Sequence, residues 1–181
     1  MSKISIKSRR QTKILLSCVV AMGAVAATLA ILYTLGNKEL RTEIVINAPE
    51  ERVWAILTDL DNYPNWNPFI TEISGDLIEG EKLKFRIEHP NQARMDFTPT
   101  VLNMDENREL RWLGMVGSGG IFDGEHRFVI ERIGENQVKF TQAERFTGIL
   151  VPFYAQSLDT NLRQGFENMN QALKELAERS S

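Results

Sequence analysis

From Phe69 to Thr147 the chain alternates apolar and polar side chains, and this pattern restricts the possible fold more than any other feature. A period of two residues is typical of strands that face a core on one side and water on the other. The clearest runs are Leu83–Ile87, Met95–Val101, Leu110–Trp112, Phe122–Ile130 and Val138–Phe146. Turns are expected between them at residues 75–80, 89–92, 105–107, 117–120 and 134–136. We therefore predict an antiparallel sheet whose apolar face needs a cover.

The predicted cover is an amphipathic helix at the C-terminus. Apolar residues recur every three or four positions from Leu158 to Leu176, and charged residues take the opposite side. No proline interrupts residues 159–179, so a helix of roughly 20–25 residues is expected. A strand at 42–47 and a helix that opens at Pro49 precede the sheet. The expected fold class is α+β, with a curved antiparallel sheet of six or seven strands around the last helix.

An uncharged run of 22 residues, Ile14–Leu35, precedes this domain. A helix of that length rises about 33 Å, enough to cross the roughly 30 Å hydrocarbon core of a bilayer. We expect a basic segment at 1–13, a transmembrane helix at 14–35, a linker at 36–41 and one domain at 42–179. The five Lys and Arg residues before the run predict a cytoplasmic N-terminus, with the domain on the outer side of the membrane. The alternative is a signal peptide, cleaved near Ala24-Val25-Ala26, that leaves a secreted domain.

Charge is distributed unevenly along the chain. All 24 acidic residues follow residue 36, together with 16 of the 21 basic residues, which gives that part a formal charge of −8. An acidic domain without clustered Lys and Arg argues against nucleic acid as a partner. Two isolated histidines and one cysteine, Cys18 in the apolar run, predict neither a metal site nor a disulfide. No cofactor is predicted either, since Gly117–Gly120 lacks the Lys and the helix of a phosphate loop.

Two motifs near the start of the domain make the chain recognisable. The first runs from Asn47-Ala48-Pro49 to Val53-Trp54, and the second is Tyr63-Pro64-Asn65-Trp66-Asn67-Pro68-Phe69. Together with Phe122–Phe128 and Glu144–Gly148, they resemble the polyketide cyclase/dehydrase, START-like superfamily (SRPBCC) over residues 42–177. The resemblance implies a helix-grip fold with a deep apolar cavity between the sheet and the last helix. The transmembrane helix would make this chain a membrane-anchored member, whereas the usual member is soluble.

The implied cavity would be lined by large side chains on the inward face of the sheet and on the last helix. The expected ligand-binding residues are Trp66, Phe69, Phe85, Met95, Phe97, Trp112, Phe122, His126, Phe128, Glu144, Phe153, Leu162 and Phe166. Ordinary packing in the core is the alternative interpretation for any single apolar member. Gly165, inside the last helix, costs about 1 kcal/mol relative to Ala and suggests a close approach by the sheet or a ligand. Residues 148–154 are interpreted as the cavity lip, a bilayer contact or a segment buried against the helix.

His126 and Glu144 are the sharpest candidates for chemistry. If residues 134–136 form a three-residue hairpin loop, His126 lies directly opposite Glu144, and Phe128 lies opposite Gln142. Directly opposed residues have Cβ atoms roughly 4.5–5.5 Å apart, which is within hydrogen-bond reach of their side chains. The pair would fix the strand register, or it would orient a polar group of a ligand. A catalytic version would use His126 as a general acid/base, with Glu144 holding its tautomer.

The leading hypothesis is a membrane-tethered domain that binds a hydrophobic small molecule or a lipid. The alternative is an enzyme of the polyketide cyclase/dehydratase type that uses His126 and Glu144 on a ligand in the same cavity. A third possibility is an interaction protein in which the pocket is vestigial. The sequence shows no nucleophile or oxyanion donor in a recognisable setting, so a role without catalysis is favoured.

Overall fold

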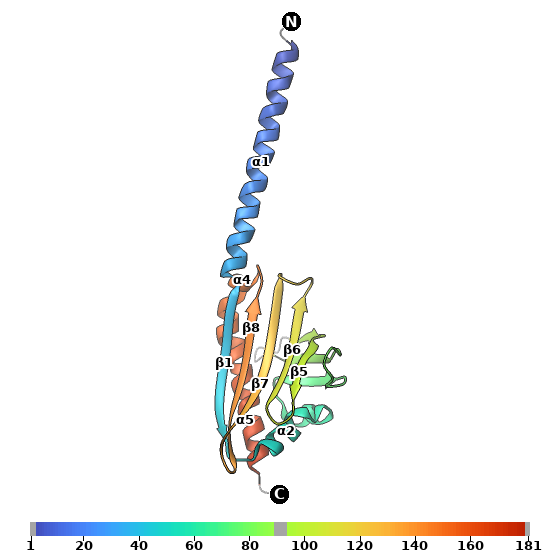
Figure 1. Ribbon diagram of the computed structural model, residues 1–181, viewed down its shortest axis with the longest axis vertical. Coiled ribbons are helices and arrows are strands. Elements are labelled where there is room, and N and C mark those ends of the chain that lie inside the picture. The colour runs from blue at the N-terminus through green and yellow to red at the C-terminus, as the bar shows by residue number, and fades with distance from the viewer. Residues whose placement is uncertain (1–2, 89–93, 180–181) are drawn as a thin grey trace.

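The computed structural model describes residues 3–88 and 94–179. An N-terminal helix, α1, leads into a domain of eight strands and further helices (Figure 1). In chain order these are α1 (Lys3–Leu35), β1 (Asn37–Ile46), α2 (Glu50–Thr58), a 3-10 turn (Leu60–Asn62), α3 (Tyr63–Trp66), β2 (Ile70–Ser74), β3 (Lys84–Glu88), β4 (Arg94–Phe97), β5 (Thr100–Asp105), β6 (Glu109–Val116), β7 (Phe122–Gly134), β8 (Gln137–Thr147), α4 (Val151–Ser157), a π-helical turn (Leu158–Leu162) and α5 (Arg163–Glu178). The turn predicted at 89–92 lies outside the described residues.

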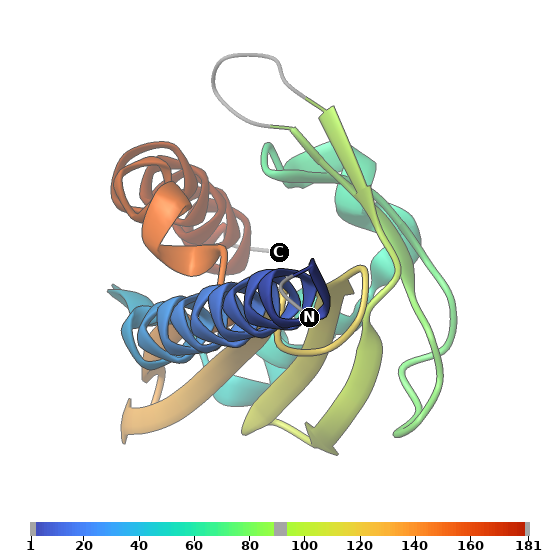
Figure 2. The same ribbon diagram turned by 90° about the horizontal axis from the view of Figure 1, so that it is seen from above.

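The strands form two antiparallel sheets rather than the single sheet of six or seven strands that we predicted. The larger sheet has the order β1-β8-β7-β6-β5, and the smaller one has the order β2-β3-β4. The run expected at 95–101 is divided into β4 and β5, because Pro99 between them has no N–H group to donate to a strand ladder. A bridge between Lys82 and Thr100 links the two sheets at this point. Viewed along α1, the strands curve around one side of the C-terminal helices (Figure 2).

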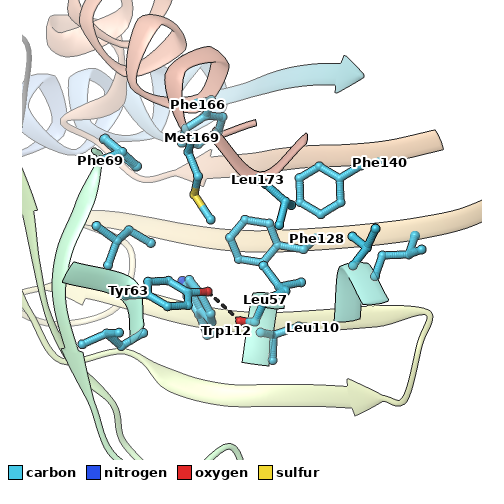
Figure 3. Close-up of a cluster of buried hydrophobic side chains, with 14 of the residues drawn as sticks. Leu57, Tyr63, Phe69, Leu110, Trp112, Phe128, Phe140, Phe166, Met169 and Leu173 are labelled. Carbon is cyan, nitrogen blue, oxygen red and sulfur yellow. Dashed lines mark hydrogen bonds between the residues drawn. The ribbon is translucent and has the colours of Figure 1, made fainter. Parts of the chain in front are cut away.

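The C-terminal helix is longer than predicted, because helical backbone runs from Val151 in α4 through the π-helical turn to Glu178 in α5. It begins before Asp159 since Pro152 is accepted in a first helical turn. Phe166, Met169 and Leu173 on α5 are completely buried. In Figure 3 these side chains face the aromatic rings of the larger sheet. The helix-grip arrangement predicted from the sequence is confirmed.

Gly165 shows how closely α5 meets the rest of the domain. A Cβ atom added to Gly165 would lie 2.4 Å from Cδ2 of Phe69, so the ring of Phe69 packs on the helix backbone. The Asn67 side chain fixes the approach, because its Oδ1 accepts hydrogen bonds from the N–H groups of Phe69 (3.0 Å) and Ile70 (2.9 Å). The expected close approach at Gly165 is therefore confirmed, and a protein side chain makes it.

The helix α1 contains an apolar stretch, Gln11–Leu35, that is long enough to cross a membrane and has none of its residues buried. This stretch could be a membrane anchor or a signal sequence. The linker predicted at 36–41 is wrong, because β1 already pairs with β8 at Asn37, opposite Thr147. Gly36 is thus the single residue between α1 and β1, and its carbonyl accepts a hydrogen bond from the N–H of Gly148 at 2.9 Å.

The hairpin of β7 and β8 has the predicted register but a different loop. His126 pairs with Glu144 and Phe128 with Gln142, as expected. The turn itself is closed by Gly134 opposite Gln137, and a register shift between Arg132 and Gly134 takes up the extra residue as a bulge. The bulge lies at the end of the hairpin, so it leaves the inward and outward faces at His126 unchanged.

Candidate functional site

The candidate site lies on the inward face of β7 and β8. The imidazole Nδ1 of His126 is 3.2 Å from Oε2 of Glu144. The His126 side chain is 6% exposed and that of Glu144 is 16% exposed, so the carboxylate lies nearer to solvent than the imidazole. The predicted contact between His126 and Glu144 is confirmed, and both side chains face inward.

Gln142 extends this pair into a group of three polar side chains. It is completely buried, and its Nε2 lies 3.1 Å from Nε2 of His126 and 3.6 Å from the Sδ of Met169. An amide NH₂ is a donor, so Nε2 of His126 acts as the acceptor and Nδ1–H donates to Glu144. Both ring nitrogens of His126 therefore have protein partners. We placed Gln142 opposite Phe128 from the sequence but gave it no role, although its parity with Glu144 could have indicated one.

One hydrogen-bond acceptor in the group of His126, Gln142 and Glu144 has no donor in the described part of the protein. The Oε1 atom of Gln142 is buried and has no hydrogen-bond donor among the described residues. A buried acceptor without a donor costs roughly 1–3 kcal/mol, and proteins keep few of them. The site thus offers an unused acceptor next to the His126–Glu144 pair, inside an otherwise apolar interior.

A pair of glycines, Gly114 on β6 and Gly124 on β7, leaves the inward face bare beside this polar group. The two residues pair directly, two residues along the strands from the pair Trp112–His126 and therefore on the same face. A Cβ atom on Gly124 would lie 2.4 Å from Oε1 of Glu144, so this glycine makes room for the carboxylate. A Cβ atom on Gly114 would meet only the carbonyl oxygen of Gly124, at 4.0 Å, so a side chain would fit above it without a clash.

Neither glycine has a positive φ, so backbone conformation does not require them. Glycine weakens a strand interior, and it often marks a place where a ligand or another backbone approaches closely. Packing explains Gly124 but leaves Gly114 without a structural reason. The glycine pair is a part of the site that sequence reasoning missed, because parity shows which face a glycine is on but not what lies above it.

Aromatic rings surround the polar group on the other side. The ring of His126 lies 4.5 Å from that of Phe128, 4.9 Å from Phe166 and 5.4 Å from Trp112, measured between centroids. Phe69 closes the layer, with its ring 5.6 Å from Phe166. Figure 3 shows Phe69, Trp112, Phe128 and Phe166 pointing into the region between the sheet and α5. The prediction that these side chains line an open cavity is wrong around His126, because the rings there contact one another.

The other predicted ligand-binding residues divide by exposure. Phe85 and Leu162 are buried, whereas Trp66, Phe97 and Phe122 are partly buried against the core. Met95 is 46% exposed and Phe153 is 69% exposed, so neither lines the interior and both predictions are wrong. Met95 has the inward parity but lies on β4, the last strand of the small sheet. Phe153 lies on α4 and faces away from the core.

A separate hollow of about 520 Å³ lies on the small sheet, away from His126. Three of its charged lining groups are paired with one another, because Arg86 binds Glu72 at 2.6 Å and Asp96 at 2.8 Å. The hydrogen bond that Arg86 donates to Asp96, together with the charges of both carboxylates, raises the pKa of Arg86. Since these groups satisfy one another, the hollow has less need of a polar ligand than the region around Gln142. Within the described ranges 3–88 and 94–179, no three His, Cys, Asp or Glu side chains gather as metal ligands would.

Comparisons with known proteins identify the family of the chain and agree with its fold. A family model described as polyketide cyclase/dehydrase and lipid transport matches residues 38–178. No curated protein sequence matches the chain. Similar solved structures include a START superfamily protein from Mycobacterium smegmatis, with 21% identity over 77% of this chain and 97% of that chain and a TM-score of 0.58.

Two further similar structures are enzymes by their names. The Zhui aromatase/cyclase from Streptomyces sp. R1128 has 11% identity over 79% of this chain and 94% of its own, with a TM-score of 0.66. Norcoclaurine synthase from Thalictrum flavum, solved with dopamine and hydroxybenzaldehyde, has 13% identity over 80% and 90%, with a TM-score of 0.61. At these identities the structural matches establish the fold alone.

Proposed function

We propose, from the premise that this chain belongs to the polyketide cyclase/dehydrase and lipid transport family, that it binds a hydrophobic small molecule or lipid on the inward face of β6, β7 and β8. Members of this family bind hydrophobic ligands. The observation that carries the proposal is the combination of an unpaired buried acceptor, Gln142 Oε1, with a glycine, Gly114, at a position where a side chain would fit without a clash. A core selected only for stability has no need of either feature.

The chemistry of the site suggests what the polar part of the ligand is. Gln142 Oε1 is an acceptor, and Glu144 presents a second carboxylate oxygen above Gly124. Such a site suits a hydrogen-bond donor, a hydroxyl or an amine, on an otherwise apolar molecule. The rings of Trp112 and Phe128 next to His126 would pack against its apolar body. Because this layer is filled without a ligand, part of it must move when the ligand enters.

We also propose that α1 is an uncleaved anchor with its N-terminus in the cytoplasm, so that the domain lies on the outer side of the membrane. The basic residues before Ile14 and the length of the apolar stretch support this orientation. A single residue, Gly36, separates α1 from β1, which would hold the ligand site close to the bilayer. Cleavage as a signal peptide is the alternative, and the mass of the mature chain distinguishes the two.

The second candidate function is an enzyme of the cyclase/dehydratase type. The His126–Glu144 contact at 3.2 Å favours it, since a carboxylate that fixes the tautomer is usual beside a general acid/base. Against it, Nε2 of His126 is occupied by Gln142, so a substrate would have to displace that amide before any proton transfer. A His126→Ala variant that still binds the ligand but no longer converts it would favour the enzyme.

Native mass spectrometry of the full chain, extracted in mild detergent, tests the proposal. We expect a bound apolar molecule that carries a hydroxyl or amine. The variant Gln142→Leu should weaken binding about tenfold, because one buried hydrogen bond is worth roughly 1–1.5 kcal/mol. Its stability should change little, because the substitution removes an unpaired buried acceptor but also the hydrogen bond from Gln142 Nε2 to His126 Nε2.

Gln164→Leu provides the matched control for this experiment. It makes the same chemical change on the exposed side of α5, where the Gln164 side chain bonds to Asn168. We expect full occupancy in this control. Equal ligand occupancy in the Gln142→Leu and Gln164→Leu proteins would contradict the proposed site.

A further inference from the structure

Exposed apolar side chains gather at the end of the domain where α1 arrives. Met115 and Val116 at the end of β6 are 52% and 45% exposed, and Phe153 and Tyr154 on α4 are 69% and 52% exposed. These four residues form what we call the α1-proximal surface. They are contiguous, because Val116 pairs with Phe122 and the ring of Phe122 lies 5.6 Å from that of Tyr154.

Charged residues are sparse at the same end of the domain. No Asp, Glu, Lys or Arg occurs in residues 112–122 or in residues 146–158. The nearest charged groups are Asp123, which pairs with Met115, and the ion pair of Lys38 with Asp159. The opposite end is highly charged, since its two turns read Asp105-Glu106-Asn107-Arg108-Glu109 and Glu131-Arg132-Ile133-Gly134-Glu135. In a domain with a formal charge of −8, the two ends therefore differ clearly in their number of charged residues. Exposed apolar surface of this kind marks an interaction site.

Main-chain hydrogen bonds fix this surface relative to α1. Gly148 N–H donates to Gly36 at 2.9 Å, and Ile149 N–H donates to Gly120 at 3.1 Å. A Cβ atom on Gly36 would lie 2.0 Å from the Gly148 carbonyl oxygen, so this contact requires glycine. Tyr33 of α1 reaches the β6–β7 turn, where a Cβ atom on Gly120 would be 4.0 Å from its ring. The junction is therefore closed by direct contacts, and the α1-proximal surface stays beside the end of the apolar helix, as Figure 1 shows.

We propose that the α1-proximal surface docks on the bilayer that α1 crosses, with Phe153 and Tyr154 in the interfacial region. Tyr and other amphipathic aromatic side chains favour this layer of a membrane, and apolar groups gain from burial in it. The position of the surface relative to the membrane fits this proposal, because the apolar run of α1 ends at Leu35 and the domain begins directly after Gly36. The inference rests on α1 as an anchor and is independent of the ligand site.

The docked surface would also place the entrance of the interior against lipid. Tyr154 packs on Phe122, and Phe122 packs on Phe146 at a centroid distance of 5.6 Å. Phe146 in turn lies beside Gly124, to within 3.4 Å of where its Cβ would be. These rings connect the α1-proximal surface to Gly124, so the apolar side chains between the membrane and the ligand site are continuous.

Spin-label accessibility in full-length protein tests the docking. Cys18→Ser removes the single cysteine, and Phe153→Cys then carries a nitroxide on the α1-proximal surface. The control label is Ile133→Cys, because Ile133 is 47% exposed at the opposite end. Both proteins are reconstituted into phosphatidylcholine nanodiscs, and relaxation by oxygen is compared with relaxation by a water-soluble nickel complex.

We expect the label at 153 to be relaxed preferentially by oxygen, at least tenfold more relative to nickel than the label at 133. Equal, water-like accessibility at both positions would overturn the proposal. Spin–spin broadening at 153 that disappears on dilution with unlabelled chain would also overturn it, because a second copy would then cover the surface. Failure of the chain to enter nanodiscs would disprove the anchor itself and the docking with it.

Discussion

The contact between Gly165 and Phe69 allows the packing of the grip to be tested with one methyl group. In an open helix position, Gly→Ala stabilises a protein by about 1 kcal/mol through helix propensity. Here the added Cβ would lie 2.4 Å and 2.6 Å from two carbons of the Phe69 ring, against an ordinary contact of about 3.5–4.0 Å. Overpacking of this kind costs roughly 1–3 kcal/mol.

The Phe69 ring has little room to retreat from a methyl group at Gly165. It is 1% exposed and stands edge-on to Phe166, and hydrogen bonds to Asn67 hold its backbone. We therefore expect Gly165→Ala to lower the free energy of unfolding by about 0–2 kcal/mol, the overpacking cost less the propensity gain. The melting temperature of the chain should fall by up to roughly 8 °C, at about 2–4 °C per kcal/mol for a protein of this size.

Thermal unfolding of the detergent-solubilised full chain, followed by circular dichroism, measures this effect. The double variant Gly165→Ala/Phe69→Leu supplies the control, since a smaller side chain at 69 removes the contact. In the Phe69→Leu background, the same Gly165→Ala change should be neutral or stabilising, which gives a positive coupling of roughly 1–3 kcal/mol. Stabilisation of the wild-type background by about 1 kcal/mol would refute the packing argument.

Three further substitutions test other parts of the account. Burial raises the pKa of Tyr63, so the folded protein keeps the phenol proton above about pH 10, where the unfolded chain loses it. Stability should then fall as pH rises past that value, and Tyr63→Phe should flatten this part of a pH series of urea unfolding curves. Asn67→Ala removes the acceptor of two main-chain N–H groups and should cost about 1–3 kcal/mol in the same assay, whereas an unchanged midpoint would contradict the role of this turn. Gly124→Ala should displace the carboxylate of Glu144 from His126, with a shift of the ¹⁵N imidazole signals of His126 in NMR spectra. Identical imidazole spectra would show that the carboxylate does not depend on the space above Gly124.

The sequence was sufficient to predict the helix grip and the contact at the centre of the site. Periodicity assigned the faces of β7 and β8 correctly, and because one face is buried, only one register was acceptable. The sequence therefore predicts that His126 lies opposite Glu144, as it does in the structure. The same argument tolerated an error in the loop, since the bulge near Gly134 changes the turn and not the faces.

Periodicity could not predict how far each inward position is covered. Met95 has the inward parity but is exposed on an edge strand. Phe153 lies in a helix that begins at Val151, so helical geometry and not strand parity sets the direction of its side chain, which is exposed. The division into two sheets depended on a single residue, Pro99, inside an otherwise regular pattern. The room for a side chain at Gly114 depends on how residues distant in the sequence pack around it, and a residue pattern does not contain that information.

The central claim is that an apolar molecule carrying a hydroxyl or an amine binds on the inward face of the sheet beside Gly114. The most direct measurement is the binding of aminoanthracene, followed by fluorescence, to the full chain carrying Gly114→Val or Leu113→Val. Valine at 114 would fill the inward space beside Glu144, whereas valine at 113 changes the outward face of the same strand. We predict binding at least about tenfold weaker for Gly114→Val with undiminished stability, and unchanged binding for Leu113→Val. Equal affinities in the two variants would contradict the account.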